Sequence, residues 1–402
     1  MQIAGIIIEY NPMHHGHSYL LEQLRSRLGA DTAVIGVMSG NFVQRGDFAL
    51  VRKHARARAA VESGVDLVLE LPMPWAVASA ERFADGGVQV LMKTGLVTDL
   101  VFGSECGEAE ALREVAACLD TPAFENGLRR ALSEGLSYAA CRQAAAGELL
   151  GREKAALLED PNNILGIEYC KALLRRGSAI RPLAVKRKGA GYHGTDVVDG
   201  MASATLLRKL LREGDREQAL LLMAPAMKAA YLAEEAAGRA PVFRANCERA
   251  ILARLRSMTE ADFAALDEGR EGLYHRLYEA SRTAASVEEV LETAKTKRYA
   301  YARLSRMVLW AYLGLTPAQF PAEVPYVRVL AANAAGRTLL GRMRETAAVP
   351  ILTKPADVRR LPEPARRLFA WEAGATDLYT LAFPNLTAAQ GGAEWREGPV
   401  IL

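Results

Sequence analysis

The first hundred residues alternate apolar runs of strand length with stretches of helical periodicity, and this alternation restricts the chain to few folds. Each run is nearly continuous, as in strands that are buried on both faces of a parallel sheet. The predicted strands cover residues 3–8, 32–38, 65–71 and 96–102, and helices are predicted up to Gly29, over about 50–63 and over 78–94. This order of elements predicts an α/β fold with a Rossmann-like parallel sheet.

A later strand is predicted over residues 180–186, after a mainly helical stretch, and it is expected to rejoin the sheet. Ser203 has the position of an N-cap for a helix that Gly214 ends. We therefore expect a first domain over residues 1–215. Residues 216–402 show helical periodicity with proline-containing breaks, so a second, α-helical domain is expected there.

The composition is that of an ordinary globular protein of 402 residues, of which 24% are charged. No apolar run approaches the roughly 20 residues that span a bilayer, and the first residues lack the basic segment of an export signal. We expect a cytoplasmic protein without membrane contact. The five cysteines are irregularly spaced and include no Cys-x-x-Cys pair, which argues against a disulfide framework or a zinc knuckle. A net charge of +3 does not by itself indicate nucleic-acid binding.

His14, Gly16 and His17 follow the first predicted strand, at the turn into the first helix. The start of a helix presents unpaired backbone N–H groups and a partial positive charge, and imidazoles there add hydrogen-bond donors for an oxyanion. Gly16 leaves room for a purine or a phosphate against the backbone. One alternative is that the histidines simply lie on the surface at the start of a helix. Metal binding is a weaker alternative, because no carboxylate or cysteine lies nearby at a recognisable spacing to complete the set of ligands. The motif favours a nucleotide phosphate site.

Polar or glycine-rich segments follow four of the predicted strands, at the sheet edge where open α/β folds bind ligands. They cover residues 9–17, 39–46, 103–107 and 187–194. A second motif, Ser203-x-Thr205-x-x-Arg208, opens the helix after the last of them. Residues three and four apart share one face of a helix, so two hydroxyls and a guanidinium could hold one anion. Alone, this motif also fits an N-cap followed by a solvated arginine.

Together the two motifs resemble those of the HIGH-type nucleotidyltransferases, in which both elements hold the phosphates of ATP. Longer blocks of sequence narrow the resemblance to the bacterial tRNA(Met) cytidine acetate ligase family. Most of them lie in the first expected domain, at residues 5–17, 37–46, 66–72, 102–105, 161–169 and 186–193. Shorter blocks at residues 295–299, 326–330 and 350–354 extend the resemblance into the second.

This resemblance implies a two-step reaction. Acetate and ATP would give acetyl-adenylate and pyrophosphate, and the acetyl group would then pass to N4 of the wobble cytidine in elongator tRNA(Met). His14 and His17 would be catalytic and stabilise charge on the α-phosphate, while Ser203, Thr205 and Arg208 would hold the β- and γ-phosphates. Mg²⁺ is expected as the counter-ion of the phosphates, with few direct protein ligands. The expected ATP contacts are Ile7, Ile8, Glu9, Tyr10, Asn11, Pro12, Met13, His14, His15, Gly16, His17, Ser18, Tyr19, Leu20, Gly103, Asn162, Asn163, Arg187, Lys188, Ser203, Thr205 and Arg208.

Two basic clusters are candidates for contact with tRNA. The expected tRNA-binding residues in the second domain are Lys295, Lys297, Arg298, Arg303 and Arg306. Two tyrosines interleave with them, a pattern that fits binding to phosphates and an unstacked base as well as a solvated helix face. The second cluster consists of Arg52, Lys53, Arg56 and Arg58, of which Lys53 could instead reach the active site.

Two other functions account for part of these features. An adenylyltransferase that acts on a small phosphorylated acceptor would use both ATP motifs, but it would not need the large and partly basic helical domain. An RNA-binding protein that keeps ATP only as a ligand would not need the intact histidines. The acetate ligase interpretation accounts for both the motifs and the helical domain.

Overall fold

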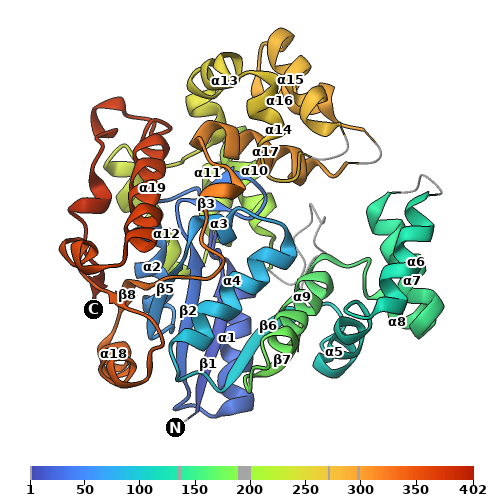
Figure 1. Cartoon of the computed structure of the whole chain (residues 1–402). Helices are drawn as coiled ribbons and strands as arrows, with labels where there is room; N and C mark the ends of the chain where they lie inside the picture. Colours follow the sequence, from blue (N-terminus) through green and yellow to red (C-terminus); the bar gives the residue numbers. More distant parts are fainter. Residues whose placement is uncertain (1, 134–136, 189–200, 270–271, 297–298) are drawn as a thin grey trace.

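The computed structural model describes residues 2–133, 137–188, 201–269, 272–296 and 299–402, and it has a central sheet with helices on both faces (Figure 1). The strands are β1 (Ile3–Ile8), β2 (Ala33–Ser39), β3 (Phe42–Val43), β4 (Asp47–Phe48), β5 (Leu67–Leu71), β6 (Asp99–Ser104), β7 (Arg181–Lys186), β8 (Val327–Ala332), β9 (Ile351–Leu352) and β10 (Val400–Ile401). The sheet has the order β10-β8-β5-β2-β1-β6-β7, with β9 paired to β8, and β3 and β4 form a separate hairpin.

The five predicted strands are all present, with ends shifted by up to three residues. They correspond to β1, β2, β5, β6 and β7, which pair in parallel as the alternation of apolar runs predicts. The late strand β7 pairs along its whole length with β6 and therefore rejoins the sheet. Because parallel strands end at the same edge, the segments after β1, β6 and β7 are brought together.

The predicted early helices are present as well. The helices up to β7 are α1 (His15–Leu28), α2 (Lys53–Glu62), α3 (Met73–Ala76), α4 (Ala80–Lys93), α5 (Ala109–Cys118), α6 (Pro122–Ser133), α7 (Tyr138–Leu150), α8 (Arg152–Ala156) and α9 (Pro161–Arg175). The later helices are α10 (Ala204–Glu213), α11 (Arg216–Leu222), α12 (Pro225–Ala236), α13 (Glu248–Ser257), α14 (Glu260–Ala264), α15 (Leu273–Thr283), α16 (Val287–Ala294), α17 (Tyr301–Leu313), α18 (Ala334–Thr346) and α19 (Glu363–Thr380). Among the described residues, no helix is both long and apolar enough to cross a lipid bilayer.

Helices on the two faces divide the core of the sheet into two clusters. Along β1, Ala4, Ile6 and Ile8 pack with side chains of α1, α2, α10 and α12. Ile3 and Ile7 of the same strand point to the opposite face, where α4 and α9 pack. The alternating directions of side chains in a strand explain this division, and burial on both faces explains why the run is continuously apolar.

Residues 216–402 also contribute strands, which differs from the expectation of a helical second domain. β8 lies antiparallel to β5, and both β9 and β10 lie parallel to β8. Every residue of β8 is buried, but Arg328 interrupts its apolar run, and β9 and β10 have two residues each. Segments this short carry no recognisable strand signal. The division of the chain at residue 215 stays a prediction.

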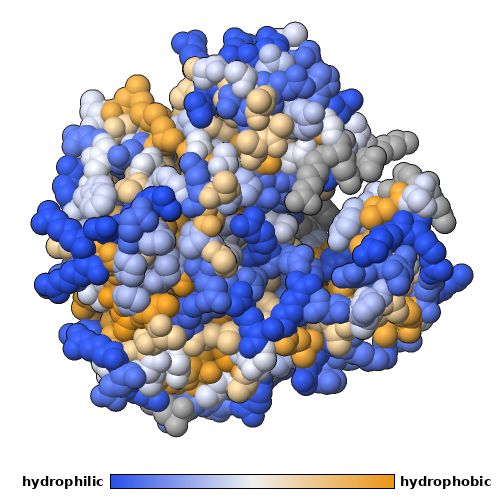
Figure 2. Space-filling model, in the orientation of Figure 1, coloured by the Kyte–Doolittle hydropathy of each residue, from blue (hydrophilic) through white to orange (hydrophobic). Residues whose placement is uncertain are grey.

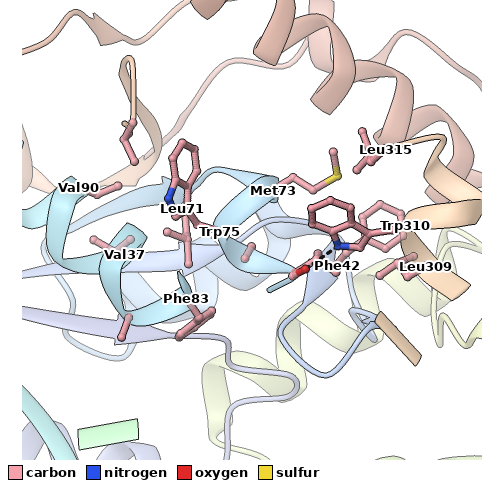
Figure 3. Packing of buried hydrophobic residues seen from close by; sticks show 14 of the residues in the cluster. Val37, Phe42, Leu71, Met73, Trp75, Phe83, Val90, Leu309, Trp310 and Leu315 are labelled. Carbon is pink, nitrogen blue, oxygen red and sulfur yellow. Dashed lines mark hydrogen bonds between the residues drawn. The ribbon is translucent and has the colours of Figure 1, made fainter. Parts of the chain in front are cut away.

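Helices α13 to α17 lie beyond the carboxyl-terminal edge of the parallel strands (Figure 1). Trp310 of α17 is buried in the core shown in Figure 3, where its Nε1 donates a hydrogen bond of 2.7 Å to the carbonyl oxygen of Val77. Gly46 joins β3 to β4 with a φ of 75°, and a Cβ atom there would lie 2.3 Å from the backbone nitrogen of Arg306. Glycine is required by this close approach, which holds the hairpin against α17.

Candidate active site

A cavity of about 290 Å³ opens at the carboxyl ends of β1, β6 and β7. The hairpin β3–β4 and the first turns of α1 and α10 complete its wall. The predicted ATP contacts that line it are Ile7, Ile8, Glu9, Tyr10, Asn11, His14, Gly16, His17, Tyr19, Leu20, Gly103, Asn162, Arg187, Lys188, Ser203, Thr205 and Arg208. Two motifs almost 190 residues apart in the sequence therefore face one cavity.

His14 and His17 form a capping box at the start of α1. Nδ1 of His14 accepts a hydrogen bond of 3.1 Å from the backbone nitrogen of Gly16. Nδ1 of His17 accepts one of 3.2 Å from the backbone nitrogen of His14. A ring nitrogen that accepts carries no proton, so the neutral form of each ring has its proton on Nε2. Both imidazoles are thereby fixed as Nε2–H donors.

Both rings are neutral near pH 7. Burial lowers the pKa of His14 to about 3, and the positive charge of Arg187 contributes to this shift. Burial and the neighbouring His14 hold the pKa of His17 well below its usual range. The ring centroids of the two histidines lie 3.9 Å apart, so both donors face the same small volume. Two adjacent neutral donors are suited to stabilise an oxyanion that develops during a reaction.

The turn between β1 and α1 is held from outside the cavity. Tyr10 has a φ of 47°, in the left-handed region that costs a residue with a side chain of order 1–3 kcal/mol. Oδ1 of Asn11 accepts a hydrogen bond of 2.7 Å from the backbone nitrogen of Leu50. The buried guanidinium of Arg56 donates to the carbonyl oxygens of Glu9 and Ser39. These contacts tie the ends of β1 and β2 together behind the histidines.

Opposite the histidines, Ser203 is the N-cap of α10, and its Oγ accepts a hydrogen bond of 3.1 Å from the backbone nitrogen of Leu206. Nη2 of Arg208 forms an ion pair with Asp47 of β4. Burial alone would raise the pKa of Asp47, but Arg208 and Arg244 lower it below its usual range. Nε of Arg208 is buried without a hydrogen-bond partner in the described structure, so one donor close to the cavity is unsatisfied.

The side of the cavity at β6 and β7 supplies further donors. A Cβ atom at Gly103 would lie 3.3 Å from the side chain of Arg187, and Nζ of Lys188 lies 5.0 Å from the centre of the Tyr19 ring. Asn162 reaches the cavity from the start of α9, where its Nδ2 donates a hydrogen bond of 2.6 Å to Glu105.

Comparisons with known proteins agree with this geometry. The family model for HIGH nucleotidyl transferases matches residues 1–394. The tRNA(Met) cytidine acetate ligase of Acetivibrio thermocellus is 35% identical, with 100% of each chain covered, and that of Syntrophomonas wolfei is 34% identical, with 100% of this chain and 99% of its own covered. The chain belongs to the tRNA(Met) cytidine acetate ligase family.

Solved structures of this ligase family have the same fold. The crystal structure of apo TmcAL from Thermotoga maritima matches with a TM-score of 0.95 at 33% identity, and both chains are covered completely. The structure of that protein bound with alpha-thio ATP matches with a TM-score of 0.93 over the same coverage. The α/β nucleotidyltransferase fold expected from the sequence is therefore confirmed, and the family match extends well beyond residue 215.

Some of the expected ATP contacts of this ligase-family chain do not line the cavity. They are Pro12, Met13, His15, Ser18 and Asn163. Asn163 is 1% exposed, and its Oδ1 accepts a hydrogen bond of 3.1 Å from the backbone nitrogen of Cys106. Conversely, Gln44, Arg45, Phe83 and Tyr169 line the cavity without having been expected there. The polar segment after the second predicted strand is the signal that could have identified Gln44 and Arg45.

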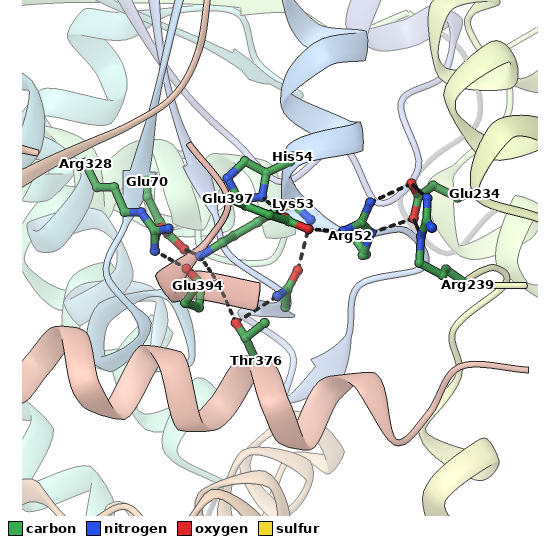
Figure 4. Close-up of polar contacts among 11 residues, drawn as sticks. Arg52, Lys53, His54, Glu70, Glu234, Arg239, Arg328, Thr376, Glu394 and Glu397 are labelled. Carbon is green, nitrogen blue, oxygen red and sulfur yellow. Dashed lines mark hydrogen bonds and ion pairs between the residues drawn. The ribbon is translucent and has the colours of Figure 1, made fainter. Parts of the chain in front are cut away.

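Most of the basic cluster at the start of α2 is engaged inside the protein. Nζ of Lys53 lies 2.7 Å from carboxylate oxygens of both Glu70 and Glu394, and Arg328 contacts the same two carboxylates (Figure 4). All four side chains are at most 5% exposed. We call these four residues the buried ion cluster. Lys53 does not line the cavity, so the suggestion that it reaches the active site is wrong, and residues distant in the sequence supply its counter-charges.

Two of the three arginines in this basic cluster also have partners inside the protein. Arg52 pairs with Glu234 and Glu397 at 2.7 Å each, and Nδ1 of His54 lies 3.1 Å from the same Glu397 (Figure 4). Arg56 is completely buried against backbone carbonyl groups. Only Arg58, at 49% exposure, lies on the surface, in an i,i+4 pair with Glu62.

The residues of this chain that were expected to bind tRNA lie in two different environments. Lys295 is exposed at the end of α16. Nη2 of Arg303 donates a hydrogen bond of 2.6 Å to the carbonyl oxygen of Glu268, and Arg306 pairs with the carboxylate of the same residue at 2.6 Å. Lys297 and Arg298 lie outside the described residues. Arg306 is only 9% exposed, so its guanidinium faces Glu268 and is largely shielded from solvent.

Proposed function

We propose that this protein joins acetate to the wobble cytidine of elongator tRNA(Met) in two steps that consume ATP. In the first step an acetate oxygen attacks the α-phosphorus of ATP, acetyl-adenylate forms and pyrophosphate leaves. In the second step N4 of the cytidine attacks the acetyl carbonyl, N4-acetylcytidine forms and AMP leaves. The observation that carries this proposal is the pair of neutral Nε2–H donors of His14 and His17 in the same cavity as Ser203, Thr205 and Arg208.

The residue roles in the first step follow from the donors and charges. His14 and His17 would donate to the α-phosphate oxygens, on which negative charge is redistributed in the transition state. Ser203, Thr205 and Arg208 would bind the β- and γ-phosphates and then the departing pyrophosphate. An arginine can bind phosphate with two parallel hydrogen bonds, and Nε of Arg208 is the available donor for the second.

The remaining cavity residues would hold the nucleotide. Arg187 and Lys188 would meet phosphate charge, and Gly103 would allow the adenosine to approach the backbone of β6. Mg²⁺ would accompany the triphosphate. The described residues contain no group of three or more His, Cys, Asp and Glu side chains suited to hold a metal ion, so phosphate oxygens and water would supply most of its ligands.

The tRNA would approach across the face that carries the cavity mouth. Figure 2 shows this molecule from one side, with a largely hydrophilic surface that is notched between the α13–α17 group and helices α6 to α8. Lys295 is exposed and would contribute a phosphate contact. For Arg303 and Arg306 such a contact would require release from Glu268.

The proposal is tested by incubating the protein with ATP, labelled acetate and total tRNA, followed by digestion of the tRNA and separation of its nucleosides. We expect the label in N4-acetylcytidine, at the wobble position of elongator tRNA(Met), and only when ATP is present. Pyrophosphate release should depend on acetate. Unlabelled tRNA together with transfer of AMP to a small phosphorylated compound would instead support an adenylyltransferase.

A further inference from the structure

Glu9 differs in charge from every other described residue that lines the cavity. It is the only acidic side chain among them, whereas Arg45, Lys186, Arg187, Lys188 and Arg208 are cationic. A carboxylate repels both the phosphates of ATP and the carboxylate of acetate. Neither substrate of the first step accounts for an acid at this place, so the second step, in which an amine reacts, is the better explanation.

The position of Glu9 is fixed through one carboxylate oxygen. Oε1 accepts a hydrogen bond of 2.9 Å from Oγ of Ser39 and another of 2.8 Å from the backbone nitrogen of Gln44. Its carbonyl oxygen accepts from Arg56, which also binds the end of β2. The side chain is thereby held at the end of β1, one residue before the strained Tyr10, and the second carboxylate oxygen takes part in neither of these hydrogen bonds.

The other titratable groups of the cavity cannot take up a proton near pH 7. Nδ1 of each histidine already accepts a backbone N–H, and Nε2 is protonated. Burial raises the pKa of the phenols of Tyr10 and Tyr169, which therefore stay protonated. Lysine and arginine side chains are already cations at this pH. Among the described lining residues, this leaves the carboxylate of Glu9.

We propose that Glu9 is the general base of the second step, an inference that rests on the proposed function. N4 of the cytidine forms a C–N bond with the acetyl carbon, the bond between that carbon and the phosphate oxygen breaks, and AMP leaves with the electron pair of the broken bond. The amine loses one proton in this step, and the carboxylate of Glu9 accepts it. The anchored Oε1 orients the side chain, and Oε2 meets the amine.

The test separates the two steps in Glu9→Gln, whose amide oxygen can still accept from Ser39 and Gln44 but cannot take up a proton. Adenylate formation is followed as acetate-dependent exchange of pyrophosphate into ATP without tRNA. Transfer is followed in a single turnover, in which enzyme with preformed acetyl-adenylate is mixed with tRNA(Met). General base catalysis contributes roughly 10²–10⁴-fold, so we expect transfer to fall about 100-fold, and at least tenfold more than adenylate formation.

A matched control is Ser39→Ala, which removes one hydrogen bond to Glu9 and keeps the carboxylate. We expect its transfer rate to fall by less than about tenfold, well short of the loss in Glu9→Gln, since the carboxylate can still take up a proton and the hydrogen bond from Gln44 remains. Equal losses of both steps in Glu9→Gln would show that Glu9 only shapes the cavity and would overturn the inference.

The pH dependence of transfer gives an independent readout. Burial raises the pKa of Glu9, although its hydrogen bonds from Gln44 and Ser39 and the positive charges of Arg56 and Arg45 act in the opposite direction, and the base is active only when deprotonated. Wild-type transfer should therefore decline on acidification at a higher pH than an ordinary carboxylate would cause, and Glu9→Gln should lack this decline. If Glu9→Gln does not fold, Glu9→Asp, which keeps a carboxylate, should retain the decline. A wild-type profile without it would overturn the inference, whereas absence of any acetylcytidine from the wild type would overturn the proposed function itself.

Discussion

Two groups of cations lie near the ends of the parallel strands and differ in what faces them. In the buried ion cluster, Lys53 and Arg328 meet the carboxylates of Glu70 and Glu394. In the cavity, five cationic side chains share the wall with a single acidic one. The first group is neutralised within the protein. In the second, Asp47 pairs with Arg208 from outside the wall, and the described lining residues still carry more positive than negative charge.

The difference shows that sequence alone does not tell whether a group of basic residues forms ion pairs inside the protein or binds an anionic ligand. Lys53 and Arg208 both lie in predicted helices, and in the sequence both look available for an anion. Lys53 lies between two buried carboxylates, which come from β5 and from the last ten residues of the chain, whereas Arg208 pairs with the single carboxylate of Asp47 and borders the cavity. Burial without compensation costs several kcal/mol per charge, so the sequence must supply a partner wherever the fold covers a cation.

The largest expected effect concerns the cavity donors. In the double variant His14→Ala and His17→Ala, acetate-dependent pyrophosphate exchange should fall about 10³- to 10⁴-fold, because each transition-state donor contributes roughly 10²–10³-fold. Loss of the cap on α1 should lower the free energy of unfolding by only about 1 kcal/mol. His15→Ala should lose less than tenfold, since that side chain does not line the cavity. Equal losses in the two proteins would contradict the assignment of the donors.

The next largest effect is expected in the buried ion cluster. Lys53→Met should lower the free energy of unfolding, measured by denaturant titration, by about 3–5 kcal/mol, because Glu70 and Glu394 would lose a buried counter-charge. The matched surface variant Arg58→Ala should cost at most about 0.5 kcal/mol. The KM for ATP of folded Lys53→Met should stay near the wild-type value. A large rise in KM at full stability would mean that Lys53 serves the cavity after all.

These two groups also indicate how far a sequence alone can lead. The buried strands and both phosphate motifs were predictable because their signals are local: an apolar run of fixed length, or a capping residue and an arginine on one helix face. The pairing of Lys53 with Glu394 was not, because 341 positions separate the two residues. The same reason applies to Arg306, whose partner Glu268 lies on another segment, and to β8, which pairs with β5 from across the chain.

A smaller effect is expected at the junction of hairpin and cavity. Asp47→Asn should weaken ATP use about tenfold in kcat/KM, because the guanidinium of Arg208 would lose the charged hydrogen bond that aims its Nε, and such bonds contribute roughly 1.5–3 kcal/mol. Asp215→Asn, which makes the same change of charge at the exposed N-cap of α11, should change kcat/KM less than twofold. Improved ATP use in Asp47→Asn would mean that Asp47 competes with the phosphates for Arg208 and does not position it.

The smallest effect is expected at Glu397, a partly exposed residue next to the buried ion cluster. Its hydrogen bond from His54 and the charge of Arg52 lower its pKa from 4.5 to about 2. A depressed folded-state pKa stabilises the protein above the unfolded value and loses this contribution as the pH falls through the folded value. Because the side chain is 37% exposed, solvent screens the pair, and we expect Glu397→Gln to cost about 1 kcal/mol at pH 7.

This cost should shrink in denaturant titrations between about pH 4.5 and pH 2, where the wild-type carboxylate becomes protonated. Glu62→Gln is the matched control, because Glu62 is also 37% exposed and forms an ion pair with the surface residue Arg58. It should cost less than about 0.5 kcal/mol. A cost for Glu397→Gln that equals the control, or that does not vary with pH, would place Glu397 with the surface pairs. Only buried ion pairs such as Lys53–Glu394 would then contribute measurably to the free energy of unfolding, and the pairs of Glu397 would not.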